Sequence, residues 1–227
     1  MDIGTNGELM LWRPDTLWAA STAAGPAFEG GEIAQGCGGV TGAIDRVWVE
    51  NGGLGAHVIG GGEAQGVCGS GLLDAAAALL ALGRLDATGA ADAPAYRLKD
   101  GVRLTAGDVR ALQLAKAAVA AGVETLLSSA GVRPAEVKRL LLAGGFGSKL
   151  NIASAAAVGL IPAALAGRAQ AVGNASLAGA AALLLDTGLR AKAERIARTA
   201  RAVRLGGDPA FEARFLAAMD FPMAQEE

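Results

Sequence analysis

The chain has 227 residues and a formal net charge of −2, so it is long enough for one large domain or two small ones, and no cluster of lysine and arginine marks a nucleic-acid binder. Hydrophobic residues make up 52% of it but aromatic residues only 4%, so we expect a core of Ala, Leu and Val on closely packed helices. Two cysteines cannot build a disulfide framework, and we recognise neither a secretion leader nor a membrane span. These features predict a cytoplasmic protein that binds neither nucleic acid nor membrane.

The first eight residues, Met1 to Glu8, predict the end of a strand followed by a tight polar hairpin with an acid at its mouth. Asp2 leaves a short apolar strand. The turn that follows offers glycine backbone and polar side chains, at Gly4, Thr5, Asn6 and Gly7. Backbone N–H groups bared by glycine turns bind phosphate oxygens, and a carboxylate beside them can hold Mg2+. Because a strand should already have begun here, we also expect the chain to be the back part of a larger fold.

Residues 1–66 predict a layer of β-hairpins, because short apolar or alternating runs are separated by turn residues. The predicted pairs are Leu9–Trp12 with Leu17–Ala20 across residues 13–16, and Ile44–Glu50 with His57–Ile59 across Asn51–Gly53. Residues 21–30 are mostly small and predict a surface loop.

The remainder, residues 67–227, predicts helices that alternate with a strand and glycine turns. Thr105-Ala-Gly-Asp108 resembles a capping box, with Asp in place of Glu, and starts a long helix that ends near Gly131. Arg139–Ala143 is an apolar strand that runs into a turn at Gly144–Gly147. Strand signals also occur at Tyr96–Val102, and further helices are expected at Gly71–Leu82, Ile152–Val158, 174–185, Arg190–Arg201 and Phe211–Met219. Hairpins followed by such units indicate an α/β or α+β fold.

Three glycine-rich turns each follow a predicted strand or open a helix, at Asp2–Gly7, Gly66–Gly71 and Gly144–Gly147. One such turn alone usually reflects only the close packing of a helix on a strand. Three together, with a carboxylate in the first, fit a nucleotide that lies across a cleft with helix N-termini facing its phosphates.

Four strings that occur in order resemble the C-terminal part of the reductive activators of corrinoid-dependent enzymes. That family is a branch of the acetate kinase, sugar kinase, heat-shock protein and actin superfamily (ASKHA). The strings are Asp2-Ile-Gly-Thr-Asn-Gly-Glu8, Ala20-Ser-Thr-Ala-Ala-Gly-Pro-Ala-Phe-Glu-Gly30, Gly66-Val-Cys-Gly-Ser-Gly-Leu-Leu-Asp74 and Leu142-Ala-Gly-Gly-Phe-Gly147. The resemblance covers nearly the whole chain and implies an α/β, RNase H-like fold. The chain would be the second half of a two-lobed ASKHA domain, with the hairpin layer at 1–66 and the helical and adenosine-motif part at 67–227. The first half and a ferredoxin-like domain are not recognisable in the sequence.

The activity implied by the resemblance is ATP-dependent reduction of cob(II)amide to cob(I)amide on a corrinoid protein or corrinoid methyltransferase. Asp2 would position Mg2+ or the attacking water. The other residues implied to contact ATP are Gly4, Thr5, Asn6 and Gly7 at phosphate, Gly69, Ser70 and Gly71 at a helix start, and Gly144, Gly145 and Phe146 at the adenosine or ribose. A 2Fe-2S cluster is expected only on the missing N-terminal domain, since two cysteines cannot supply four thiolates. Whether the isolated chain is an active enzyme stays open.

Two alternatives remain open. Activators of 2-hydroxyacyl-CoA dehydratases place two cysteines per subunit around a 4Fe-4S cluster shared by a homodimer, and Cys37 and Cys68 would be the matching pair here. The other alternative is a non-catalytic docking module, because the chain on its own carries one wall of the expected ATP cleft. In the corrinoid-activator family, the resemblance also implies that residues 21–30 help to form the surface that faces the partner.

Overall fold

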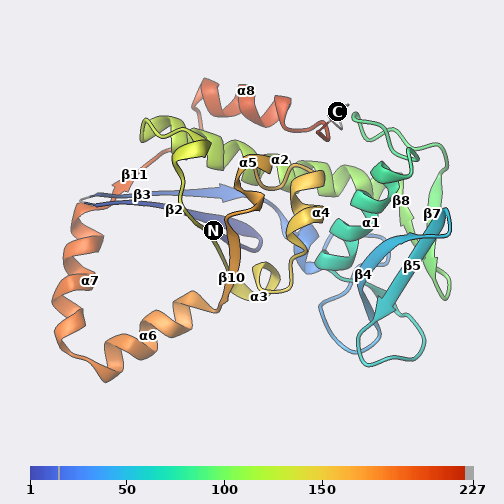
Figure 1. The fold of residues 1–227 in the computed structure, drawn as a ribbon, viewed down its shortest axis with the longest axis horizontal. Helices are drawn as coiled ribbons and strands as arrows, with labels where there is room; N and C mark the ends of the chain where they lie inside the picture. Colours follow the sequence, from blue (N-terminus) through green and yellow to red (C-terminus); the bar gives the residue numbers. More distant parts are fainter. Residues whose placement is uncertain (15, 223–227) are drawn as a thin grey trace.

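The computed structural model describes residues 1–14 and 16–222, and its principal feature is a six-stranded sheet in the order β10-β9-β1-β2-β3-β11 (Figure 1). The strands are β1 (Asp2–Ile3), β2 (Asn6–Arg13), β3 (Thr16–Ala23), β9 (Leu140–Ala143), β10 (Ala169–Gly173) and β11 (Arg201–Ala202). The first three form an antiparallel meander, β9 is parallel to β1, and β10 is parallel to β9. A meander continued by parallel strands is the topology expected of an RNase H-like half, and the predicted fold class is confirmed.

Helix α2 (Ala106–Ser129) covers one face of this sheet, and α8 (Pro209–Ala217) lies on the outer side of α2 (Figure 1). The predicted capping box is present, because the Thr105 hydroxyl accepts from the Asp108 N–H at 3.2 Å while Asp108 Oδ2 accepts from the Thr105 N–H at 2.7 Å. Leu9 of β2 is 1% exposed beneath α2, where Gly122 leaves room for it. By length and composition α2 could cross a membrane, but 78% of its apolar window is buried, so within the described residues it is a core helix.

A smaller three-stranded sheet, β5-β4-β6, forms the other end of the molecule (Figure 1). Its strands are β4 (Ala43–Glu50), β5 (Gly53–Val58) and β6 (Gly66–Val67). Helix α1 (Gly69–Ala81) packs on β4 and contacts α4 (Ile152–Ala157). The β4–β5 hairpin turns at Asn51 and Gly52, both with positive φ, as the sequence predicted. A hairpin of β7 (Ala95–Lys99) and β8 (Val102–Thr105) replaces the single strand expected at Tyr96–Val102, because Asp100 and Gly101 both take positive φ and reverse the chain.

Besides α4, further helical segments lie between residues 134 and 199. They are η2 (Pro134–Glu136), α3 (Gly144–Gly147), α5 (Ala163–Ala166), α6 (Ala175–Leu185) and α7 (Gly188–Thr199). Helices α6 and α7 leave the body in an arc that returns to the sheet edge at β11 (Figure 1), and neither has a buried residue. The helix expected to reach Arg201 ends earlier, because Arg201 and Ala202 pair with β3.

Two expected loops are wrong. Residues 21–30 are no surface loop: they complete β3 and form a 3₁₀ helix, η1 (Pro26–Glu29), in which Ala27 and Phe28 are 2% and 3% exposed. The turn expected at Gly144–Gly147 is a single helical turn, α3, closed by the Ser148 N–H donating to the Gly144 carbonyl at 3.1 Å. Of the predicted turn at residues 13–16, Asp15 lies outside the described residues.

Candidate functional site

The hairpin at the start of the chain places an acid and a tight turn side by side. Strand β1 ends at Ile3 and β2 begins at Asn6, and the Gly4 N–H donates to the Asn6 carbonyl at 2.9 Å across the turn. Thr5 and Asn6 are exposed, whereas Asp2 is half-buried between Glu8 of β2 and Ala143 of β9. The strand therefore fixes the carboxylate while the turn leaves polar groups open to solvent.

The second predicted turn lies directly against Asp2. Gly144 opens α3 with a φ of +83°, and a Cβ atom at this position would overlap Asp2 Oδ1. Only glycine fits this position, because both the conformation and the close approach of the carboxylate exclude a side chain. The next residue, Gly145, is exposed, and a Cβ there would meet no heavy atom within 4 Å. The parallel pairing of β1 with β9 thus brings the two turns together beside open space.

Helix η1 connects this pair of turns to the third. Glu29 accepts a hydrogen bond from the Thr5 N–H at 3.2 Å and another from the Thr5 hydroxyl at 2.5 Å. The Phe28 ring stacks on the Phe146 ring of α3 with centroids 4.7 Å apart. The Phe28 carbonyl lies so close to Gly69 that a Cβ there would overlap it. One short helix therefore touches all three predicted loops.

Glu29 is a functional candidate that we did not predict from the sequence. The signal that could have found this helix is Pro26 at the first helical position, flanked by Gly25 and Gly30, which both take positive φ. Phe146, by contrast, has one ring face covered by Phe28, so only its remaining surface can meet a ligand.

The glycines at the start of α1 serve close packing. A Cβ at Gly69 or Gly71 would overlap the carbonyl of Phe28 or of Ile44. Ser70 is 7% exposed, and its hydroxyl lies 3.3 Å from Cys68 Sγ. Its side chain is thus turned into the protein and does not face the exposed hairpin.

Gly7 is similarly placed beneath α2. A Cβ on Gly7 would lie 3.0 Å from Thr22 Cγ2 and 3.4 Å from Val119 Cγ2. Its backbone pairs with β1 on one side and with β3 on the other. Gly7 and Ser70 are therefore buried in the packing of the protein, whereas three other predicted site residues are exposed to solvent: Thr5, Asn6 and Gly145.

The two cysteines lie near each other at the junction of β6 and α1. The Cys37 N–H donates to the Val67 carbonyl at 3.0 Å, and Cys68 is 6% exposed. Burial, and secondarily the neighbouring Cys68, raises the pKa of the Cys37 thiol above its ordinary value. Within the described residues no group of three or more His, Cys, Asp or Glu side chains is placed to hold a metal ion.

Asp74 and Lys116 are buried ionisable groups that lie outside the hairpin. Asp74 of α1 is 3% exposed, and burial raises its pKa; its Oδ1 has no hydrogen-bond partner among the described residues. Lys116 of α2 is 1% exposed, donates to the Asp220 carbonyl and lies 5.0 Å from the centre of the Phe221 ring. Burial lowers the pKa of Lys116 to about 8. The lysine holds the end of the described chain against α2.

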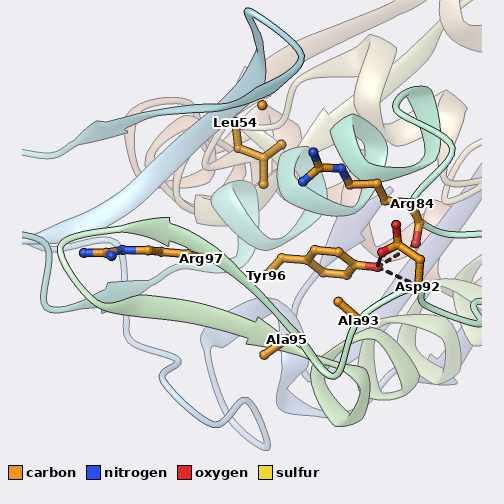
Figure 2. Close-up of a pocket in the computed structure, with 8 residues that line it drawn as sticks. Leu54, Arg84, Asp92, Ala93, Ala95, Tyr96 and Arg97 are labelled. Carbon is orange, nitrogen blue, oxygen red and sulfur yellow. Dashed lines mark hydrogen bonds between the residues drawn. The ribbon is translucent and has the colours of Figure 1, made fainter.

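A cavity of about 450 Å³ lies away from the hairpin, between the end of α1, the β4–β5 turn and β7 (Figure 2). Figure 2 shows the Tyr96 ring at its centre, with the hydroxyl 2.6 Å from both the Arg84 carbonyl and Asp92 Oδ1. The Asp92 N–H in turn donates to the hydroxyl at 3.0 Å. These bonds tie the end of α1 to β7, and no lining residue belongs to the hairpin site. The cavity is therefore not the candidate site.

Comparison with known proteins finds a family match that spans the whole chain. Residues 1–227 match the family model described as the C-terminal domain of RACo, the ASKHA domain. The chain is 34% identical to the corrinoid activation enzyme RamQ of Eubacterium limosum over 93% of the chain and 40% of that protein. It is 29% identical to the reductase of the Co(II) methylated amine-specific corrinoid protein of Methanosarcina barkeri, over 82% of the chain and 38% of that protein.

A solved structure, the reductive activator for corrinoid, iron-sulfur protein, superposes with a TM-score of 0.87 at 34% identity. The match covers 97% of this chain and 39% of that one. The chain thus spans about two-fifths of the length of the relatives it matches. With a family match over its full length and this agreement in fold, the chain belongs to the family of C-terminal ASKHA domains of RACo.

Proposed function

We propose that the chain is the ATP-binding part of a reductive activator that returns cob(II)amide to cob(I)amide on a corrinoid protein or corrinoid methyltransferase. The observation that carries the proposal is the contact of the Asp2 carboxylate with Gly144, which joins the two predicted phosphate and adenosine loops beside open space. Three relatives are named for corrinoid activation or reduction, which supports the substrate class.

The residues at the hairpin fit a magnesium nucleotide. Asp2 offers a half-buried carboxylate, and the exposed residue Thr5 has an N–H and a hydroxyl, both of which donate to Glu29 when no phosphate is bound. Mg2+ prefers one or two carboxylates together with water and phosphate oxygens, so Asp2 alone is a sufficient protein ligand. Gly145 has no side chain to fill the space above α3, where a nucleoside would need to enter. Polyphosphate would otherwise be repelled by the carboxylates of Asp2 and Glu29, and a divalent cation would screen that repulsion.

Each residue would then have a defined task. Asp2 would orient Mg2+ or the attacking water, and the backbone of Gly4 together with Thr5 and Asn6 would bind phosphate. Gly144, Gly145 and the free surface of Phe146 would bound the adenosine or ribose. The start of α1 would contact the nucleotide only through the backbone of Gly69, Ser70 and Gly71, because the Ser70 hydroxyl is turned inward. Bound ATP would favour one arrangement of the corrinoid protein over another by its differential affinity.

The electron would come from a group that this chain does not hold. Reduction of Co(II) to Co(I) consumes one electron, and a reduced 2Fe-2S cluster would supply it and become oxidised. Such a cluster does not fit this chain, because Cys37 and Cys68 are too few for four thiolate ligands. We therefore propose that the cluster lies on an N-terminal ferredoxin-like domain, preceding the first ASKHA half. The chain itself would form the second half, with its hairpin layer at 1–66 and its helical part at 67–227.

The alternative activator, with a 4Fe-4S cluster shared by a homodimer, has less support. Cys68 is 6% exposed and its sulfur contacts the Ser70 hydroxyl inside the protein. A cluster that bridges two copies needs both sulfurs at the surface. Cytoplasmic location remains a prediction from the sequence.

Isothermal titration calorimetry of the 227-residue chain with Mg-ATP tests the proposal. We expect micromolar binding, and we expect Asp2→Asn to remove the dependence of that affinity on Mg2+, because the neutral amide is a poor ligand for a hard cation. Glu212→Gln on α8 is the control, since it removes one exposed acid far from the hairpin. Absence of heat with the wild-type chain would favour the docking module, and unaltered Mg2+ dependence in Asp2→Asn would remove Asp2 from the site.

A further inference from the structure

Glu29 is held at the hairpin by the polar groups of a single residue. Its Oε1 accepts from the Thr5 N–H at 3.2 Å and its Oε2 accepts from the Thr5 hydroxyl at 2.5 Å. The carboxylate also lies over the turn itself, since a Cβ on Gly4 would be 3.2 Å from Oε1. Thr5 and Glu29 are both exposed, so no surrounding side chains enclose this pair.

The groups that hold Glu29 are the same ones that a phosphate would use. A carboxylate and a phosphate both present anionic oxygens, and both accept from a backbone N–H and a hydroxyl in a tight turn. The Thr5 N–H can donate fully to one acceptor at a time. Phosphate that binds at Thr5 must therefore remove Glu29 from this position, and the negative charge of Glu29 opposes its approach.

Resting on the proposed nucleotide site, we propose that Glu29 is a positioning residue that occupies the phosphate donors of the hairpin and is displaced when phosphate binds. The displacement acts on η1, because Glu29 is its last residue. In the same helix the Phe28 ring is stacked on Phe146, 4.7 Å away. Phosphate binding at Thr5 therefore removes one attachment of η1, while the aromatic contact of the adjacent Phe28 remains.

The test is the affinity of the full chain for Mg-ATP and for Mg-tripolyphosphate, measured by calorimetry on wild type and Glu29→Gln. The glutamine keeps the size of the side chain but loses the charge and half of its acceptors, so it competes less well for Thr5. We expect Glu29→Gln to bind both probes about fivefold more tightly, the size of an exposed charge-assisted contact. A residue that merely stabilised the turn would instead weaken binding when replaced.

Glu32→Gln is the matched control. It removes the same charge three positions along the chain, and Glu32 makes no side-chain hydrogen bond to the described residues. Its affinities should equal those of wild type. Equal tightening in both variants would show a general effect of charge and would overturn the role of Glu29.

The two probes separate this inference from the proposed function. If Mg-ATP binds wild type and Glu29→Gln equally well or the variant more weakly, the nucleotide site stands and the role of Glu29 falls. If only tripolyphosphate binds, and more tightly to the variant, the role of Glu29 stands and the nucleotide site falls. If neither probe binds either protein, both proposals fail.

Discussion

Replacing Lys116 with methionine should change how the stability of the chain depends on pH. The side chain is 1% exposed, and burial lowers its pKa from the ordinary value of 10.5 to about 8, against the opposing effect of Asp220. Between these two values the unfolded chain holds the proton while the folded chain has released it. The unfolded state therefore binds more protons, and the free energy of unfolding of wild type rises as the pH rises from about 8 towards 10.5.

The size of the effect follows from the two pKa values. From these values, the free energy of unfolding of wild type should rise by about 2 kcal/mol between about pH 7 and about pH 9.5. Below pH 8, burial of the charged lysine lowers the free energy of unfolding by about 3 kcal/mol in total. In Lys116→Met this gain is absent, while the other titrating groups contribute equally to both proteins. The variant also loses a donor to the Asp220 carbonyl, which lowers its stability by about 1 kcal/mol at every pH.

Urea unfolding followed by circular dichroism at both pH values measures the difference. Lys138→Met is the control, because it removes an exposed lysine and should keep the slope of wild type. Equal changes in stability with pH for wild type and Lys116→Met would refute the reasoning. It would mean that the lysine keeps its proton in the folded chain, with water reaching the ammonium.

Two further changes test the hairpin and the long helix. Gly144→Ala should destabilise the chain by at least about 1 kcal/mol, because alanine is strained at positive φ and its Cβ would push the Asp2 carboxylate aside. The control is Gly145→Ala, which should be tolerated because its Cβ would meet no neighbour. Thermal unfolding and Mg-ATP titration of the two variants measure the difference. Equal melting temperatures and equal affinities would contradict the packing of Asp2 on Gly144. Thr105→Ala should lower the free energy of unfolding by about 1 kcal/mol, because the Asp108 N–H loses its acceptor. Thr105→Ser keeps a hydroxyl and should keep the stability of wild type. A serine variant as unstable as the alanine variant would contradict the helix cap.

Features set by neighbouring residues could be predicted from the sequence. The Asp2 hairpin depends on glycine and polar residues within one turn, and the start of α2 depends on Thr105 and Asp108, which contact each other locally. The family resemblance added the roles of the loops, as residues that face one nucleotide; the direct contact between the first and third glycine turns was found only in the structure.

Features set by distant partners could not be predicted in this way. Strand β11 has two residues and exists because Arg201 and Ala202 pair with β3 from far along the chain. The burial of Phe28 depends on Phe146 and on the carbonyl contact with Gly69, which no local pattern contains. For the same reason the mostly small residues of 21–30 predicted a loop where the fold contains the end of β3 and a packed helix. Gly7 and Ser70 show the converse, since residues suited to a phosphate loop are used for packing.

The exposed helix α6 has a consequence for the local stability of the chain. It has eleven residues, none of them buried, and Leu177, Leu184 and Leu185 are 65%, 77% and 89% exposed. A helix shorter than about 12–15 residues is marginal in water unless tertiary contacts support it. The amide protons of α6 should therefore exchange with solvent through openings that cost little free energy, long before those of α2. In a protease digest, the first cuts are expected in this arc, while the six-stranded and three-stranded sheets stay intact.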